Sequence, residues 1–262
     1  MDLGLSGKSV IVTGASRGIG LAVTRTLIGQ GASVVAVSKG GSAELKELEE
    51  TGRVHAVAVD LTNPQAPAAV VEATLSAFGR LDVLVNNVGA VRPRVDGFRS
   101  VTDDDWETTF QINFFSTVRM TRAALPHLLA AGGGSIVTVS SVNAVLPDPL
   151  VIDYSAAKAA LANFSKSLSK EAGPASIRVN TVSPGPVATD LWLGDGGVAA
   201  TIASATGGDP EAVADKAASG SVTGRFTRPE EVADLVAFLA GDRATNITGA
   251  DFTVDGGLIT TL

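Results

Sequence analysis

Tyr154 and Lys158 are the residues of this sequence whose types and spacing best suit acid–base chemistry. They are four positions apart, and on a helix this spacing places both side chains on one face, one turn from each other. Tyr154 is also the only tyrosine in the 262 residues. The pKa of an unperturbed phenol, about 10, is too high for proton transfer near neutrality, but a neighbouring ammonium stabilises the phenolate. The pair therefore predicts a catalytic tyrosine whose pKa is lowered by Lys158.

Ser141 is the second candidate catalytic residue, because it ends a predicted strand shortly before Tyr154. Open parallel sheets bind their ligands at the carboxyl ends of the strands. We therefore expect the Ser141 hydroxyl beside the phenol, where it would hold a substrate oxygen.

A glycine-rich turn, Gly14-Ala15-Ser16-Arg17-Gly18-Ile19-Gly20, connects the first predicted strand to the first predicted helix. Glycines let the backbone turn tightly and approach a pyrophosphate, while the helix N-terminus supplies free N–H groups and partial positive charge. The turn predicts a dinucleotide site, with a purely structural glycine turn as the alternative. The positive ring of an oxidised nicotinamide would add to the effect of Lys158 on the pKa of Tyr154.

The end of the second predicted strand bears on the choice of cofactor. Ser38 and Lys39 stand where an Asp or Glu would bind a ribose 2′-hydroxyl and repel a 2′-phosphate, and Arg17 would lie close by. NADP(H) is therefore favoured; NAD(H) stays open if Lys39 is an ordinary surface lysine. Asp60 and Leu61, after the third strand, are expected at the adenine edge, unless Asp60 is only a strand-end carboxylate.

Short runs rich in valine and isoleucine alternate with longer helical stretches. Strands that are apolar throughout are typical of a parallel sheet covered on both faces. The alternation predicts an α/β fold: a single-domain, doubly wound parallel sheet with helices on both faces, spanning residues 1–262. The predicted strands are Ser9–Thr13, Ser33–Val37, Val54–Val59, Leu81–Asn86, Ser135–Val139, Ile177–Val182 and Asp251–Val254. The predicted helices are Ile19–Gln30, Ala43–Glu50, Ala66–Phe78, Asp103–Ala131, Asp153–Ala172 and Pro229–Ala240.

Two helix starts carry the pattern of a capping box, Thr102 with Asp105 and Thr227 with Glu230. Between the last two predicted strands, Leu191–Thr227 breaks the alternation with glycine clusters and one or two short helices. A segment of this length in a compact domain is usually functional or mobile. We expect a lid over the substrate, with a solvated excursion as the alternative.

Composition excludes several classes of protein. A net charge of −7 argues against nucleic acid or a polybasic membrane contact as partner. The sequence has no cysteine and two histidines, which excludes thiol nucleophiles and a cysteine- or histidine-rich metal site. No apolar run reads as a membrane span or a signal peptide, so a cytoplasmic protein is expected.

Together these motifs resemble the short-chain dehydrogenase/reductase family over nearly the whole chain, and in particular its NADP(H)-dependent ketoreductases and 3-oxoacyl-carrier-protein reductases. The resemblance implies a seven-stranded Rossmann sheet and hydride transfer between nicotinamide and a carbonyl or alcohol. The matching motifs are Thr13–Gly20, Asp60-Leu61, Asn86-Asn87-Val88-Gly89, Asn113, Ser141, Tyr154-Ser155-Ala156-Ala157-Lys158, Arg178-Val179-Asn180, Pro184-Gly185 and Asp255-Gly256-Gly257.

The resemblance also implies roles for single residues. Tyr154 would be the general acid/base and Ser141 would position the substrate oxygen. Lys158 would also bind the nicotinamide ribose, and Asn113 would hold a water at the start of a proton relay. Further cofactor contacts are implied for Asn87, Gly89, Pro184, Gly185, Val187 and Thr189, the last at the nicotinamide carboxamide. The one departure is Val88, where the family usually has alanine, and only a small packing change is expected.

The pocket walls are predicted from position. Besides Ser141 and Tyr154, we expect Asn143, Pro186 and Trp192 to bind substrate, with Trp192 as a core aromatic in the alternative. Most neighbouring residues are apolar, which predicts a small carbonyl or alcohol substrate with a largely apolar body, and Asn143 is the polar group expected to point inward. Arg92 and Arg94 either form a solvated face or attract an anionic substrate.

Three rival functions stay open. A 3-oxoacyl-carrier-protein reductase would need a basic dock for its acidic carrier. Pro126–Gly134 and Ala172–Ser176, expected to flank the mouth, hold no Lys or Arg, whereas Arg92, Arg94 and Arg99 keep this function open. An NAD-dependent alcohol dehydrogenase working oxidatively and a non-enzymatic dinucleotide sensor would share the same fold.

The Tyr154 helix is apolar on more than one face, through Ala156, Ala157, Ala159, Ala160, Leu161, Ala162 and Phe164. One face must meet the sheet, so another is expected to meet a second subunit. The family resemblance implies a homotetramer, and a homodimer stays open.

Overall fold

Seven parallel strands form one sheet in the order β3-β2-β1-β4-β5-β6-β7 in the computed structural model, which describes residues 1–261. Leu262, the last residue of the predicted domain, lies outside the described residues. The predicted doubly wound α/β sheet is confirmed, and each predicted strand is present, the first and last with the predicted bounds and the others with ends shifted by one or two residues. The strands are β1 (Ser9–Thr13), β2 (Ser33–Ser38), β3 (Val54–Ala58), β4 (Val83–Asn86), β5 (Gly134–Val139), β6 (Ile177–Pro184) and β7 (Asp251–Val254).

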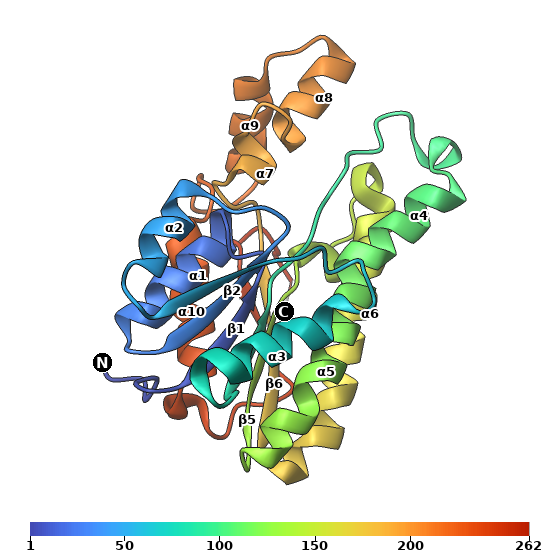
Figure 1. Cartoon of the computed structure of the whole chain (residues 1–262). Coiled ribbons are helices and arrows are strands. Elements are labelled where there is room, and N and C mark those ends of the chain that lie inside the picture. The colour runs from blue at the N-terminus through green and yellow to red at the C-terminus, as the bar shows by residue number, and fades with distance from the viewer. Residues whose placement is uncertain (262) are drawn as a thin grey trace.

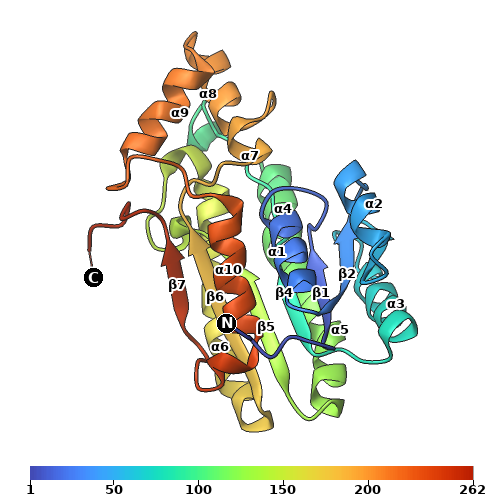
Figure 2. The ribbon, with the colours of Figure 1, turned by 90° about the vertical axis from the view of Figure 1, so that its left-hand side faces the viewer.

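Helices cover both faces of this sheet, as Figures 1 and 2 show. On one face lie α1 (Gly18–Gly29) and α10 (Pro229–Ala240), with α2 (Ala43–Glu49) toward the β3 edge. On the other face lie α3 (Ala66–Phe78), α5 (Ser116–Ala130) and α6 (Ile152–Ala172), and α4 (Asp103–Phe110) packs on α6.

The residues of β1 show why the strands are apolar throughout. Val10 and Val12 pack in the core cluster with α1 and α10, whereas Ile11 packs in the cluster with α3 and α5. All three side chains are fully buried. A strand covered by helices on both faces buries successive side chains, so its central positions favour apolar residues, which is the physical basis of the runs.

The strand order reverses between β1 and β4, and this reversal opens a crevice at the carboxyl ends of the strands. Three short helices extend beyond this edge: α7 (Asp190–Leu193), α8 (Val198–Thr206) and α9 (Pro210–Ser219) (Figure 1). They occupy the segment for which one or two short helices were expected.

Two helix predictions need correction. The predicted helix Asp103–Ala131 is divided, because a π-helical segment, Gln111–Phe115, separates α4 from α5. The predicted capping box Thr227–Glu230 is displaced by one residue. Proline pre-sets the first helical position at Pro229, so the Glu231 carboxylate accepts from the Arg228 backbone N–H at 2.8 Å. The Thr102–Asp105 capping box is confirmed.

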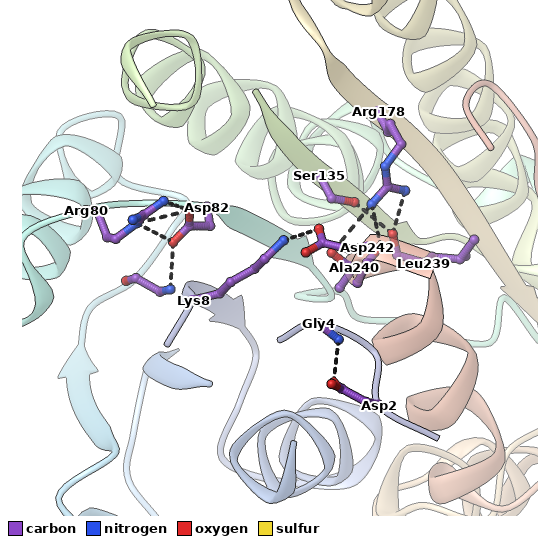
Figure 3. Close-up of polar contacts among 12 residues, drawn as sticks. Asp2, Gly4, Lys8, Arg80, Asp82, Ser135, Arg178, Leu239, Ala240 and Asp242 are labelled. Atoms are coloured by element: carbon purple, nitrogen blue, oxygen red, sulfur yellow. Dashed lines mark hydrogen bonds and ion pairs between the residues drawn. The ribbon is translucent and has the colours of Figure 1, made fainter. Parts of the chain in front are cut away.

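Ion pairs and hydrogen bonds to backbone carbonyls connect elements at the opposite edge of the sheet, where the strands begin (Figure 3). Arg178 donates to the carbonyls of Leu239 and Gly241 at the end of α10, at 2.7 and 3.0 Å. Arg80 pairs with Asp82, and Lys8 pairs with Asp242. The arginine that opens the Arg178-Val179-Asn180 motif thus caps a helix, since cations satisfy the free carbonyls of a helix C-terminus.

The stretches Pro126–Gly134 and Ala172–Ser176 also lie at this amino edge, since they lead into β5 and β6. The expectation that they flank the mouth was therefore wrong for this chain. No helix in residues 1–261 is long and apolar enough to cross a membrane.

Candidate active site

A cleft of roughly 1620 Å³ opens at the carboxyl edge, between the strand ends and α7–α9. Nearly all of the predicted site residues line it, although they come from segments distributed over most of the chain. Gly20 and Asn113 are the exceptions, and both pack directly behind residues that line the cleft. The topology thus brings the predicted catalytic, cofactor and substrate residues to one cleft.

The glycine-rich turn has the shape of an anion cradle. Gly14 and Gly18 adopt φ of +66° and +53°, and a Cβ on Gly20 would lie 2.1 Å from the Gly14 carbonyl oxygen. Arg17 precedes α1 without a side-chain cap on the helix N–H groups. Asn87 braces the turn by donating to the carbonyls of Thr13 and Gly14, at 2.9 and 3.2 Å. The turn therefore fits a dinucleotide pyrophosphate.

The 2′ end of the cofactor site holds an ion pair. Lys39 Nζ lies 2.8 Å from Asp60 Oδ2, and hydrogen bonds from Lys39 and Thr62 lower the pKa of Asp60 to about 2. Ser38 donates its hydroxyl to the Gly40 carbonyl at 2.7 Å, and Arg17 is exposed on the same side of the cleft. Both predicted cations thus line the cleft, and Lys39 already has a carboxylate partner.

Tyr154 and Lys158 lie in the first two turns of α6, as predicted. Lys158 Nζ is 5.6 Å from the centre of the Tyr154 ring and donates to the Val139 carbonyl at 3.0 Å. Burial raises the pKa of Tyr154 to about 12, against the lowering effect of the Ser141 hydroxyl. Burial also lowers the pKa of Lys158 to about 8.

The expectation of a lowered Tyr154 pKa was therefore wrong for the protein without cofactor, in which this pKa is raised. Desolvation disfavours the charged form of both groups and is the largest cause of both pKa shifts.

Ser141 is buried at the end of β5 and is held by Asn143. Its hydroxyl donates to the Asn143 side-chain oxygen at 3.2 Å and accepts from the Asn143 backbone N–H at the same distance. The Asn143 amide donates onward to the Leu146 carbonyl at 3.2 Å. Asn143 lines the cleft as expected, but its carboxamide is committed to Ser141 and Leu146.

Asn113 is fully buried in the π-helical segment. Its side chain donates to the carbonyls of Ala90 and Thr109, at 2.8 and 3.0 Å, and accepts from the Ala90 backbone N–H at 3.1 Å. A Cβ on Gly89 would lie 2.9 Å from the Asn113 side-chain oxygen, so a larger residue here would have to displace that oxygen. A local change of helical pitch of this kind is frequent at functional sites, and sequence periodicity does not reveal it.

The segment that follows β6 lies over the glycine-rich turn. A Cβ on Gly18 would lie 3.1 Å from the Thr189 methyl group, and the Pro186 carbonyl accepts from the Thr227 backbone N–H at 2.9 Å. Trp192 lines the cleft and packs edge-on against Phe226, with ring centres 5.5 Å apart. Trp192 is half-buried and belongs to neither core cluster, so the core-aromatic alternative is not supported, and substrate contact stays a prediction.

Arg94 was expected either on a solvated face or as an attractor of anionic substrates, and both expectations were wrong. Its side chain is only 11% exposed and pairs with Asp105 and Asp153. Both carboxylates are distant in sequence, so no local pattern could have revealed the pairing. Arg92 is exposed.

Comparisons with known proteins agree with this geometry. The family model described as enoyl-(acyl carrier protein) reductase matches residues 14–259. The uncharacterised oxidoreductase YvrD of Bacillus subtilis is 35% identical, and the match covers 100% of both chains. The 3-oxoacyl-[acyl-carrier-protein] reductase FabG of Thermotoga maritima is 34% identical, over 97% of this chain and 99% of its own. The structure of L-sorbose reductase from Gluconobacter frateurii, complexed with NADPH and L-sorbose, superposes with a TM-score of 0.91 at 36% identity, covering 100% of each chain.

The chain belongs to the short-chain dehydrogenase/reductase family. It is an NAD(P)-dependent oxidoreductase with a Rossmann fold, which confirms the predicted fold and enzyme class.

Proposed function

We propose that this enzyme reduces the carbonyl group of a small substrate with NADPH, and that Tyr154 is the proton donor. The observation that carries the proposal is the meeting of the Tyr154 phenol, the Ser141 hydroxyl and the buried Lys158 beside a turn shaped for a dinucleotide. When bound, the nicotinamide supplies the hydride.

The reductive direction would use Tyr154 in its protonated form. A phenol with a pKa of about 12 keeps its proton at neutral pH, so Tyr154 is ready to donate from its Oη. Oxidation of an alcohol would instead need the phenolate as base. A substrate oxygen placed between Tyr154 and Ser141 would accept from the phenol, and the Ser141 hydroxyl would turn its proton from the Asn143 side-chain oxygen to the substrate.

The residues that return the proton to Tyr154 lie behind it. Lys158 is mostly protonated near neutrality, because its pKa is about 8. It would pass a proton toward the phenolate oxygen, with a water held near Asn113 as the next donor. Lys158 would also bind the nicotinamide ribose.

The cofactor would lie along the cleft from Thr189 to Lys39. The glycine-rich turn and the N-terminus of α1 would hold the pyrophosphate, and Asn87 and Gly89 would line the nicotinamide half. At the other end, Lys39, Ser38 and Arg17 would bind the 2′-phosphate, for which the NADPH complex of the similar sorbose reductase gives support. Asp60 and Leu61 would lie at the adenine edge.

The substrate end of the cleft supports a ligand with a largely apolar body. Leu146, Leu150 and Leu191 line the cleft and are exposed to 38–44%, which leaves apolar surface for a ligand to cover. We propose that α7–α9 act as a lid on this surface, with Pro186 and Trp192 at its base. We also propose a cytoplasmic site of action, because nicotinamide dinucleotides are intracellular.

A second candidate is reduction of a 3-oxoacyl group on a carrier protein, as the similarity to FabG suggests. Arg92 and Arg99 are exposed in the loop after β4 and would offer a basic contact. A rate with the carrier-linked substrate that exceeds that of the free thioester and falls with salt would favour this candidate.

The first test is NADPH oxidation, with NADH in parallel, over ketones including ketoses, aldehydes, quinones, imines and acyl thioesters. Turnover of a free carbonyl compound with a strong preference for NADPH is expected. A preference for NADH would contradict the proposed use of NADPH. Tight cofactor binding without any turnover would contradict the proposed reduction and favour a dinucleotide sensor that catalyses no reaction.

Tyr154→Phe tests the proton donor. The variant should lose turnover by about 10²–10⁴-fold, the usual contribution of a positioned acid, because only the phenol oxygen is removed. NADPH affinity, measured by fluorescence titration, should stay within about twofold. A variant that no longer binds NADPH would show that Tyr154 serves binding and not proton transfer.

A further inference from the structure

Arg94 joins three segments beside the active site. It lies in the loop between β4 and α4, and its Nη1 donates to Asp105 in the first turn of α4 at 2.9 Å. Its Nε and Nη2 donate to Asp153 in the first turn of α6, at 3.2 and 2.5 Å. Its backbone N–H donates to the Leu150 carbonyl, just before α6, at 2.6 Å. The guanidinium is thus committed to two helix starts and not to a ligand.

Asp153, the partner of Arg94, directly precedes Tyr154 and is 1% exposed. Its Oδ2 also accepts from the Thr109 hydroxyl at 2.7 Å, whereas its Oδ1 is buried without a hydrogen-bond partner among the described residues. Burial alone would raise the pKa of Asp153, but the bonds from Arg94 and Thr109 hold it below its ordinary value. The carboxylate therefore stays charged, and it would be a buried, uncompensated charge without Arg94.

Asp153 lies in the first turn of α6. The first N–H groups of a helix have no partner within the helix, and the residue before α6, Val151, provides no side-chain cap. A carboxylate in the first turn is stabilised by the helix dipole, and here it is anchored by a cation from another segment. The phenol of Tyr154 projects from this same turn.

Thr109 extends the contact to the π-helical segment. Its hydroxyl donates to Asp153, and its backbone carbonyl accepts from the Asn113 side chain at 3.0 Å. One cluster, Arg94 with Asp105, Asp153 and Thr109, therefore touches both the turn that carries Tyr154 and the side chain of Asn113.

We propose that Arg94 is a positioning residue of this enzyme, which acts through Asp153 and Thr109 to hold the Tyr154 phenol in place relative to Ser141 and Asn113. The proposal rests on the proposed role of Tyr154 as proton donor. The competing explanation is that the ion pair only stabilises the fold.

Kinetics of Arg94→Met separate the two explanations. A displacement of the phenol by about 1 Å should lower kcat by about 10²-fold, while the KM and the Kd for NADPH stay within about twofold. The matched control is Arg80→Met, which removes the Arg80–Asp82 pair at the opposite edge of the sheet (Figure 3). The control should lose thermal stability and keep its kcat.

Arg94→Lys should restore only part of the rate, because an ammonium cannot bond Asp105 and Asp153 in the forked geometry of a guanidinium. A kcat of Arg94→Met that equals the wild-type value would overturn the proposal. A loss of NADPH binding in parallel with kcat would do the same, since it would indicate a general collapse of the site.

The single tyrosine permits a readout that does not depend on turnover. Protein labelled with 3-fluorotyrosine should give one ¹⁹F resonance, from position 154. Arg94→Met should shift or broaden this resonance, and Arg80→Met should leave it unchanged. If the wild-type enzyme reduces no carbonyl compound, the proposed function fails, and the ¹⁹F spectra still decide whether Arg94 positions the phenol.

Thr109→Val is the reserve variant if Arg94→Met does not fold. It removes one bond to Asp153 and keeps the shape of the side chain. A smaller change of kcat and of the ¹⁹F resonance in the same direction is expected. Unchanged values of both would overturn the proposal.

Discussion

At the scale of single residues, Lys39 has two competing partners. Its ion pair with Asp60 is exposed to solvent, and pairs of this kind contribute little free energy. A dianionic 2′-phosphate between Lys39, Ser38 and Arg17 would offer more charge and more acceptors. We therefore expect Lys39 to exchange Asp60 for the phosphate when NADP(H) binds.

Lys39→Ala tests this exchange. The variant should bind NADPH about tenfold more weakly, the loss of one charge-assisted hydrogen bond, and NADH with little change. Kd values for both cofactors from fluorescence titration measure the difference. Lys46→Ala, an exposed lysine on α2, is the matched control. Equal losses for NADPH and NADH in Lys39→Ala would contradict a role at the 2′-phosphate.

The buried ammonium of Lys158 should appear in the pH dependence of stability. Its pKa is about 8 in the folded protein and 10.5 ordinarily, so the unfolded chain binds more protons between these values. Stability attributable to Lys158 therefore rises with pH through this window and is lost as pH falls through about 8.

From pH 8 to pH 9.5, below the ionisation of an ordinary tyrosine, the wild-type protein should gain about 1–2 kcal/mol of unfolding free energy relative to Lys158→Met. Urea denaturation at the two pH values measures this gain. An equal change of unfolding free energy with pH in the two proteins would show that the Lys158 ammonium is not desolvated.

At the scale of elements, the strand–turn–helix that carries the dinucleotide site depends on one close approach. Gly20 lies so near the Gly14 carbonyl that no larger residue fits, although it stands inside a helix where alanine is otherwise favoured. The glycine-rich motif identifies Gly20 in the sequence, and the close contact with the Gly14 carbonyl explains why glycine is needed there.

Gly20→Ala should therefore lower both thermal stability and NADPH affinity, because the added methyl group would force the turn away from α1. Gly29→Ala is a matched control at the other end of the same helix, where a Cβ meets nothing within 4 Å. It should be neutral or stabilise the protein by up to about 1 kcal/mol. Thermal unfolding and fluorescence titration give both values. Wild-type behaviour of Gly20→Ala would mean that the turn can move.

At the scale of the whole molecule, we propose that α6 pairs with a second copy of the chain. Ala157 and Leu161 are buried against the rest of the protein, whereas Ala159 is exposed on another face of the same helix. A helix with small apolar residues outside its packed face suits a partner helix. A homotetramer is expected, with a homodimer as the smaller assembly.

Light scattering after gel filtration should give the mass of four chains, or of two. Ala159→Arg should reduce it, because a charged side chain cannot be buried between paired helices without a partner. Ala69→Arg on the exposed face of α3 is the control and should keep the assembly. A wild-type monomer would contradict the proposal.

The sequence by itself determined the strand–helix alternation, the dinucleotide turn and the Tyr154–Lys158 pair. Each of these depends on neighbours within one or two turns of chain: glycines where the backbone must turn, apolar runs where both faces are buried, and a spacing of four on one helix. Parallel topology then brings strand ends to one edge, which is why Ser141 and the predicted cofactor residues line one cleft.

Only the tertiary structure decided the rest. Arg94 and Asp153 are 59 residues apart, so no local sequence pattern indicates their pairing. This pairing is what excluded a solvated face for Arg94. The π-helical segment around Asn113 lies against α6, and the periodicity of the sequence did not reveal it. The raised pKa of Tyr154 follows from burial in the assembled cleft by segments distant in the sequence, and such burial does not follow from the spacing of residues along the chain.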